Sequence, residues 1–289
     1  MSTSLMVRHN RVEAFAEAWE QPAVAAAPDP NDPSAVADRA RTLAAAWIPN
    51  VADRVDFIAD RCRGQNVLDI GCVAHDPSRM DDPRWLHRHV AEAARTCVGV
   101  DILEAGIEAV RDAGFDAVAH DLSTGLGPLA DRAPFDRIVA GEVIEHLGDL
   151  DMLFRVAALG LSDDGQLILT TPNPYAPARV EAGQRGVIWE NTDHVSYLFP
   201  AGVAELARRH GLVLREATTI AVPEPVGAIR RLKQWIRASG WRLVGYDTTD
   251  DVGRQIRLPM AGRRDRRMAR RGLRFIGETA IYVVGRPTR

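Results

Sequence analysis

The segment NVLDIGC, residues 66–72, decides the fold class of this chain. Its first five residues are a short run of mainly branched apolar side chains, which is typical of a buried strand in a parallel sheet. The run ends at Gly71, where the absence of a Cβ lets the backbone approach a ligand closely. The segment therefore predicts a buried strand that opens into a ligand-binding turn containing Gly71 and Cys72.

Six further apolar runs extend from this segment along the chain and alternate with helical patterns. The runs lie at 97–102, 116–121, 135–144, 165–172, 212–220 and 279–285. Helical spacing of apolar residues covers 84–95, 104–113, 149–160, 200–210 and 35–61, the last as one or two helices broken near Pro49. Strands that alternate with helices predict a doubly wound α/β fold with a largely parallel sheet covered on both faces.

Composition and patterning predict four segments. These are a lead segment with helices (1–62), a core (63–223), a basic insertion (224–274) and a final strand of the core (275–289). The insertion carries 14 Lys and Arg against five Asp and Glu, whereas the whole chain has a net charge of −3.

The hydrophobic fraction of 46% is that of an ordinary globular protein. No apolar stretch approaches the roughly 20 residues of a membrane span, and the N-terminus lacks a secretory pattern, so a cytoplasmic location is expected. Three scattered cysteines predict neither a disulfide framework nor a zinc cluster, and no metal site is expected.

The carboxyl ends of the predicted strands carry residues suited to the parts of a nucleoside. Asp101 ends the second strand, where a carboxylate can accept both hydroxyls of a ribose. Asp121 and Leu122 follow the third strand and suit an exocyclic amine and an apolar base face. The fourth strand opens into Glu142, Glu145 and His146.

In this order, VLDIGC, GVDI, FDRIVAGEVIEHL and GQLILTTPNP resemble the class I methyltransferases that use S-adenosylmethionine, particularly the group related to ubiquinone biosynthesis and small-molecule O-methylation. The resemblance covers about residues 64–220 and the last strand near 279–285. It implies a seven-stranded Rossmann-like sheet whose last strand is antiparallel. It also implies S-adenosylmethionine as cofactor and methyl transfer to a hydroxyl of a small-molecule, sugar or lipid-linked acceptor.

The resemblance assigns cofactor contacts to residues at the strand ends. Asp69 would support the amino group of the methionine moiety, or it would only cap the loop. Asp101 would bind the ribose, or it would cap the next helix. The complete set of expected cofactor-binding residues is Asp69, Gly71, Cys72, Asp101, Ile102, Asp121, Leu122 and Glu142; Glu142 could equally serve as a structural hydrogen-bonding residue.

The turn after the first strand departs from the family pattern. Gly71 is followed by Cys72, Val73, Ala74 and His75, so only one glycine is present where the family has several. The loop around the methionine moiety must therefore be shaped differently. The missing GxGxxG cradle also counts against a nicotinamide dehydrogenase.

Catalytic candidates follow the fourth and fifth strands. His146 and His194 would face the acceptor, one of them as general base, with Glu145 orienting or charging one of the two. His194 with Tyr197 also resembles a substrate-facing loop of the family.

The run RRDRRMARRGLR at 263–274 predicts a lid or docking face for an anionic group on the acceptor, or else a solvated helix. The run contains no aromatic residue for base stacking, so a nucleic acid partner is not expected. Two alternatives stay open: an RNA or protein methyltransferase, and a cofactor-binding protein without catalysis. The oligomeric state is not readable from the sequence.

Overall fold

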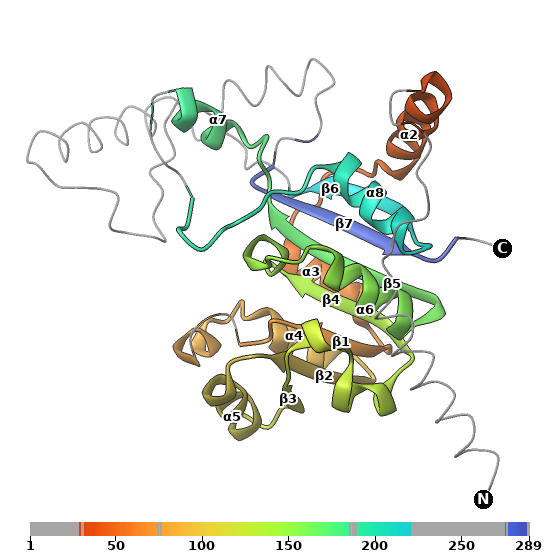
Figure 1. The fold of residues 1–289 in the computed structure, drawn as a ribbon. Helices are drawn as coiled ribbons and strands as arrows, with labels where there is room; N and C mark the ends of the chain where they lie inside the picture. Colours follow the sequence, from red (N-terminus) through yellow and green to blue (C-terminus); the bar gives the residue numbers. More distant parts are fainter. Residues whose placement is uncertain are drawn as a thin grey trace, which may run out of the picture.

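The computed structural model describes residues 29, 32–73, 75, 77–184, 186, 190–220, 275 and 277–287. Within them, seven strands form one sheet in the order β3-β2-β1-β4-β5-β7-β6 (Figure 1). The strands are β1 (Asn66–Ile70), β2 (Thr96–Asp101), β3 (Ala117–Ala119), β4 (Phe135–Gly141), β5 (Leu161–Pro172), β6 (Val213–Thr219) and β7 (Thr279–Gly285). β7 is antiparallel to both β5 and β6, and the other neighbouring strands are parallel. The predicted doubly wound sheet with an antiparallel last strand is confirmed.

Helices precede the sheet and connect its strands. They are α2 (Pro33–Ala46), α3 (Arg54–Cys62), α4 (Leu86–Ala93), α5 (Glu104–Asp112), α6 (Asp151–Gly160), α7 (Pro177–Gln184) and α8 (Pro200–Arg209), with the 3₁₀ turns η1 (Pro77–Asp81), η2 (Leu122–Thr124), η3 (Gly127–Arg132) and η4 (Ile144–His146). The break between α2 and α3 contains Pro49, as the sequence predicts. α3 begins at a cap in which the Asp53 carboxylate accepts from the backbone N–H groups of Val55 and Asp56.

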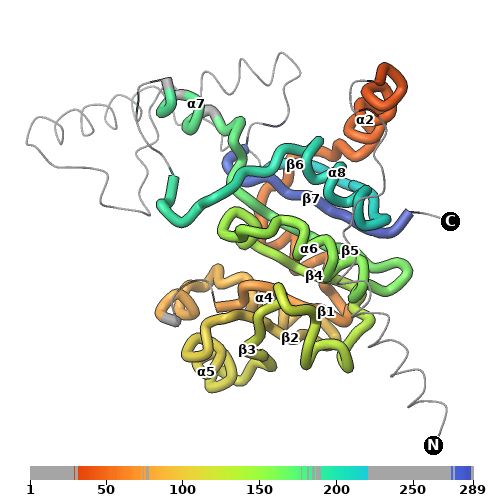
Figure 2. The backbone as a smooth tube through the Cα atoms, in the orientation of Figure 1, coloured from red at the N-terminus to blue at the C-terminus, as the bar shows by residue number. Residues whose placement is uncertain are grey.

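Alternating strand residues build two cores, one on each face of the sheet. Leu68 of β1 belongs to the larger core, which includes Phe154 of α6 and Val203 of α8. The neighbouring Val67 points the other way and packs with Ile58 of α3 and residues of α4. The tube in Figure 2 likewise separates α6 and α8 from α3 and α4 across the sheet. Burial on both faces explains why the strands read as nearly continuous apolar runs.

The structure differs from the sequence prediction at four elements. β4 ends at Gly141 rather than at 144. β5 begins at Leu161 rather than at 165, because Leu161 pairs with Phe135 before a register shift in the ladder. Gly165 permits this bulge, since a Cβ there would lie 2.9 Å from the Phe135 carbonyl oxygen. β3 is shorter than predicted, and α7 has no strong apolar periodicity that could have announced it.

The predicted basic insertion at 224–274 lies outside the described residues. Among the residues that the structure describes, no helix combines the length and apolar composition needed to cross a membrane.

Candidate cofactor and acceptor pocket

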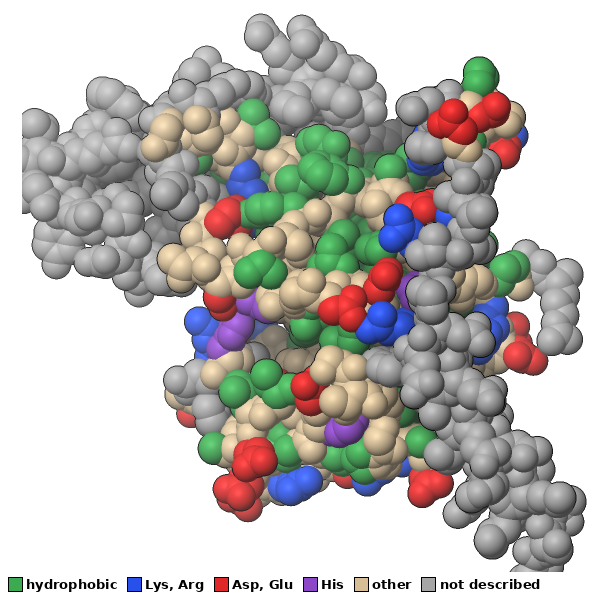
Figure 3. All heavy atoms as spheres, viewed as in Figure 1, with side chains coloured by type: hydrophobic (Ala, Val, Ile, Leu, Met, Phe, Trp, Pro, Cys, Tyr) green, Lys and Arg blue, Asp and Glu red, His purple; other side chains and the backbone are tan. Residues whose placement is uncertain are grey.

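A cavity of about 960 Å³ opens at the carboxyl ends of β1, β2 and β4. In an open α/β sheet this edge is where ligands bind. On the face drawn in Figure 3, histidine side chains lie at the edge of a hollow in the molecular surface. The cavity is lined by all of the expected cofactor-binding residues and by the three catalytic candidates; these are Asp69, Gly71, Cys72, Asp101, Ile102, Asp121, Leu122, Glu142, Glu145, His146 and His194.

Backbone strain marks the ends of β1 and β4. Gly71 has φ +77°, and a Cβ at this position would lie 2.4 Å from Cγ2 of Val143. Glu142 adopts φ +59° although it carries a side chain. Non-glycine residues in this left-handed region are uncommon and cluster at functional sites.

Asp101 and Asp121 hold their loops by hydrogen bonds to backbone N–H groups. The Asp101 carboxylate accepts from the N–H of Val73 at 3.3 Å and from that of Leu103 at 3.1 Å. Hydrogen bonds from the side chain of Ser123 and from its backbone N–H lower the pKa of Asp121. Asp121 is the N-cap of η2, whereas Asp101 does not cap α5, whose N-cap residue is Leu103; both carboxylates line the cavity. Ile102 is 69% exposed beside Asp101 and offers an apolar surface to a ligand.

Asp69 is buried and paired with a histidine that sequence reasoning did not connect to it. Nδ1 of His87, on α4, lies 2.8 Å from Oδ2 of Asp69. The two partners are 18 residues apart, and only the packing of α4 against β1 brings them together.

Two neighbouring carboxyl groups lie at the end of β4 and in η4. Burial raises the pKa of Glu142, and the nearest cation is Arg54, whose Nη1 lies 3.9 Å from Oε1 of Glu142. Glu145 is only 1% exposed, and burial together with the negative charge of Glu142 raises the pKa of Glu145 to about 8. Glu145 is thus a neutral acid at neutral pH, unlike an ordinary surface glutamate.

Three imidazoles meet on the side of the cavity that faces away from Asp69 and Asp101. The ring of His146 makes edge contacts with those of His75 and His194, each at 4.8 Å between centroids. Asp193 Oδ2 lies 3.2 Å from Nδ1 of His146, and Glu190 Oε2 lies 3.2 Å from Nδ1 of His194. The structure thus brings His146 and His194 together as expected, but Asp193 and Glu190, rather than Glu145, pair with them.

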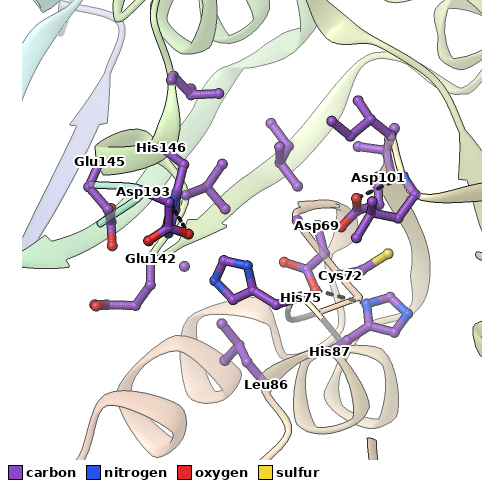
Figure 4. Close-up of a pocket in the computed structure, with 18 of the residues that line it drawn as sticks. Asp69, Cys72, His75, Leu86, His87, Asp101, Glu142, Glu145, His146 and Asp193 are labelled. Atoms are coloured by element: carbon purple, nitrogen blue, oxygen red, sulfur yellow. Dashed lines mark hydrogen bonds and ion pairs between the residues drawn. The ribbon is translucent and has the colours of Figure 1, made fainter. Parts of the chain in front are cut away.

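Burial lowers the pKa of His146, and the nearby Asp193 carboxylate opposes this effect. His146 is therefore unprotonated at neutral pH and able to accept a proton. In Figure 4, His75 lies between the Asp69 side of the cavity and the side formed by His146 and Asp193.

Two sets of these side chains have ligand atoms within 4.8 Å of one another and could hold a metal ion: His75, His146 and Asp193, and Glu145, His146 and His194. From the sequence, Glu145, His146 and His194 were expected as catalytic residues and no metal site was expected; His75 and Asp193, which complete the first set, were not predicted.

This fold and the position of its pocket define a doubly wound α/β protein that binds its ligand at the strand switch point. The chain belongs to the family of methyltransferase domains, since the model described as "Methyltransferase domain" matches residues 38–217. The family predicted from the sequence is thereby confirmed; the narrower group of small-molecule O-methyltransferases stays a prediction.

Two curated relatives are similar to this chain. A "Probable S-adenosylmethionine-dependent methyltransferase" of Mycolicibacterium smegmatis is 29% identical over 180 residues, which are 55% of this chain and 65% of the relative. "Methyltransferase GfsG" of Streptomyces halstedii is 30% identical over 205 residues, which are 67% of this chain and 66% of the relative. The matched region thus spans slightly less than two thirds of each relative.

Solved structures also resemble the chain. A methyltransferase of Archaeoglobus fulgidus described as SAM-dependent is 16% identical, with a TM-score of 0.45 and coverage of 85% of this chain and 93% of that one. A putative methyltransferase solved in complex with the Haloferax volcanii activator Trm112 is 15% identical, with a TM-score of 0.49 and coverage of 89% and 95%.

Proposed function

We propose that this chain is an S-adenosylmethionine-dependent methyltransferase whose acceptor is a hydroxyl on a small-molecule, sugar or lipid-linked substrate. The observation that carries the proposal is one cavity with two chemically different ends. Asp101, Asp121 and Leu122 offer nucleoside contacts at one end, and His146 and His194 offer proton acceptors at the other. Family membership supports the methyl-transfer chemistry.

The residues present fit the cofactor. Gly71 lines the cavity with backbone alone, and the Asp101 carboxylate, which also lines it, suits the two ribose hydroxyls. When bound, S-adenosylmethionine supplies an electrophilic methyl group on a sulfonium. The protein's own task is then to hold the acceptor oxygen in line with that methyl and to exclude water. An unprotonated His146 would take the hydroxyl proton at its Nε2 as the new bond forms, because its Nδ1 faces the Asp193 carboxylate and donates to it.

The segments have different roles in this proposal. Residues 63–223 with 275–289 form the cofactor-binding core, preceded by the lead segment 1–62, and residues 224–274 form a lid or docking face on the acceptor side. The basic character of 224–274 favours an acceptor that carries an anionic group.

Calorimetry with S-adenosylmethionine and its demethylated product, S-adenosylhomocysteine, tests the cofactor. Asp101→Ala is expected to weaken binding more than tenfold, because each lost charge-assisted hydrogen bond costs about 1.5–3 kcal/mol. Asp101→Asn keeps one acceptor oxygen, which can serve the N–H group of Val73 or that of Leu103 but not both, so it disturbs the loop less than Asp101→Ala does. Asp112→Ala, at an exposed aspartate on the following helix, is the matched control. No binding by the parent protein at millimolar ligand would contradict the proposal.

A labelled methyl donor tests the acceptor class. Label in a small-molecule or lipid extract is the expected result. Label in RNA or protein would select the alternative that the basic insertion suggests, and tight cofactor binding without any labelled product would indicate a protein without catalysis.

A further inference from the structure

The pair formed by Asp69 and His87 is the most deeply buried charged contact at the cavity. Asp69 lines the cavity from the end of β1, and its side chain is 3% exposed; the side chain of His87 is 1% exposed. The distance of 2.8 Å between Nδ1 and Oδ2 is that of a strong hydrogen bond.

The surroundings define which nitrogen carries the proton. A carboxylate oxygen accepts, so Nδ1 of His87 donates. Nε2 is buried and has no hydrogen-bond partner within the described part of the chain. A proton on Nε2 would be an unpaired buried donor, which is costly. Nδ1 is therefore the nitrogen of His87 whose N–H points at Asp69.

The ring itself cannot turn away from Asp69. It packs against the rings of Trp85 and Phe115, with centroids 5.4 Å from each; these two rings are 5.3 Å apart, so the three rings form a triangle. A Cβ on Gly99 of β2 would lie only 2.8 Å from Cε1 of His87, so the ring fills the space above this glycine.

The residue just before α4 also holds in place the turn after β1, which lacks the family's glycines. Nε1 of Trp85, the residue before α4, donates to the carbonyl oxygen of Cys72 at 2.9 Å. Trp85 thus fixes the backbone after Gly71, and His87 fixes the carboxylate before it. Figure 4 shows His87 on the far side of Asp69 from the centre of the cavity.

We propose that His87 is a positioning residue that holds the Asp69 carboxylate toward the cavity, where Asp69 receives the ammonium group of the cofactor's methionine moiety. A glycine-rich turn would position the cofactor through its own backbone. In this chain, side chains of Trp85 and His87 hold the turn and the carboxylate in place instead. This inference rests on the proposed function, since it assigns a contact to the same cofactor.

Comparison of two ligands separates positioning from a structural role. S-adenosylhomocysteine carries the ammonium group, whereas methylthioadenosine keeps the nucleoside and thioether but lacks the amino acid part. His87→Phe keeps a buried ring and removes the donor. We expect it to weaken S-adenosylhomocysteine binding at least tenfold and methylthioadenosine binding less than twofold, as measured by calorimetry. An amide nitrogen in His87→Asn reaches the Nδ1 position and should restore most of the lost affinity.

Two controls complete the experiment. His89→Phe changes a histidine of the same helix whose Nε2 lies 2.7 Å from the Pro83 carbonyl oxygen, and it should change neither affinity. Adding His87→Phe to Asp69→Asn should cause no further loss. If His87→Phe does not fold, His87→Gln gives the same comparison, because its amide reaches the Nε2 position instead.

Equal losses for both ligands, or an unchanged affinity in a folded His87→Phe protein, would overturn the positioning role while leaving the proposed function intact. A parent protein that binds neither ligand would overturn both.

Discussion

At the scale of single residues, the site places a protonated acid beside an unprotonated base at neutral pH. Glu145 is a neutral acid because it is buried beside Glu142, and His146 is an unprotonated base because burial lowers its pKa. An acid and a base that coexist at neutral pH are what proton transfer requires.

His146→Ala tests the general base. We expect turnover to fall about 10²- to 10⁴-fold, with S-adenosylhomocysteine affinity unchanged. In the parent protein, the rate should fall only below pH 6.5, because the pKa of His146 is lowered from 6.5 and the protonated ring cannot accept a proton. A pH-rate profile checks this, with His194→Ala measured in parallel.

A chelator distinguishes this base from a metal ligand. Turnover that is unchanged by EDTA agrees with the base. If EDTA abolishes turnover and a divalent metal restores it, His146 acts instead within one of the two ligand sets described above. If His146→Ala and His194→Ala both kept the parental rate and pH-rate profile, neither histidine would be the general base. Alignment of the acceptor with the methyl group would then account for the rate.

Glu145→Gln tests the buried acid through stability. The folded protein raises the pKa of Glu145 from 4.5 to about 8, so the unfolded chain ionises first and stability falls as pH rises between these values. The variant should therefore melt at a higher temperature than the parent above about pH 8 and at a similar temperature near pH 4.5. At about 1.4 kcal/mol per pKa unit, the difference is on the order of a few kcal/mol.

Glu205→Gln is the matched control for this experiment, because hydrogen bonds from Arg208 lower the pKa of Glu205 on α8. It should lose stability rather than gain it at high pH. If the melting temperatures of Glu145→Gln and the parent changed with pH in the same way, the proposal that Glu145 is a buried neutral acid would be contradicted.

At the scale of elements, α4 and β2 fit together at one glycine. A Cβ on Gly99 would lie 2.7 Å from Sγ of Cys72 and 2.8 Å from Cε1 of His87. Both side chains are buried, so neither can move aside cheaply.

Gly99→Ala should therefore destabilise the fold by about 1–3 kcal/mol, the usual cost of overpacking. Chemical denaturation measures it. Gly202→Ala, in α8 with open space around it, should be neutral or stabilising. Equal stabilities of Gly99→Ala and the parent would show that α4 shifts without cost.

The element scale also shows what the sequence can predict. All seven strands were predicted, because their burial on both faces leaves apolar runs such as NVLDI, with boundaries that differ mainly at β3 and β5. The strand-end residues Asp101 and His146 were predicted for the same reason, since a parallel sheet collects its carboxyl ends at one edge. The pairs of Asp69 with His87 and of His146 with Asp193 were not, because helix packing and loop paths determine these contacts.

At the scale of the whole molecule, charge separates along the chain. Residues 224–274 are strongly basic, whereas the chain as a whole has a net charge of −3. Replacing Arg263, Arg264, Arg266 and Arg267 by serine should leave cofactor affinity unchanged, because the expected cofactor-binding residues all lie between 69 and 142 and line the cavity. Turnover of an anionic acceptor should drop and lose its salt dependence. Rates equal to those of the parent at every salt concentration would identify the run as a solvated surface.

The place of β7 in the sheet has a consequence for synthesis on the ribosome. β7 lies between β5 and β6, yet it is translated about 60 residues after β6 ends. At about 5–20 residues per second, this delay is about 3–12 s. Throughout that interval the nascent chain presents the unpaired edge of β5, with Leu167, Ile168 and Leu169, and a β6 that lacks its neighbour in the sheet. Unpaired apolar edges associate readily with other chains, so chaperones that act during translation have most to protect in the seconds before β7 emerges.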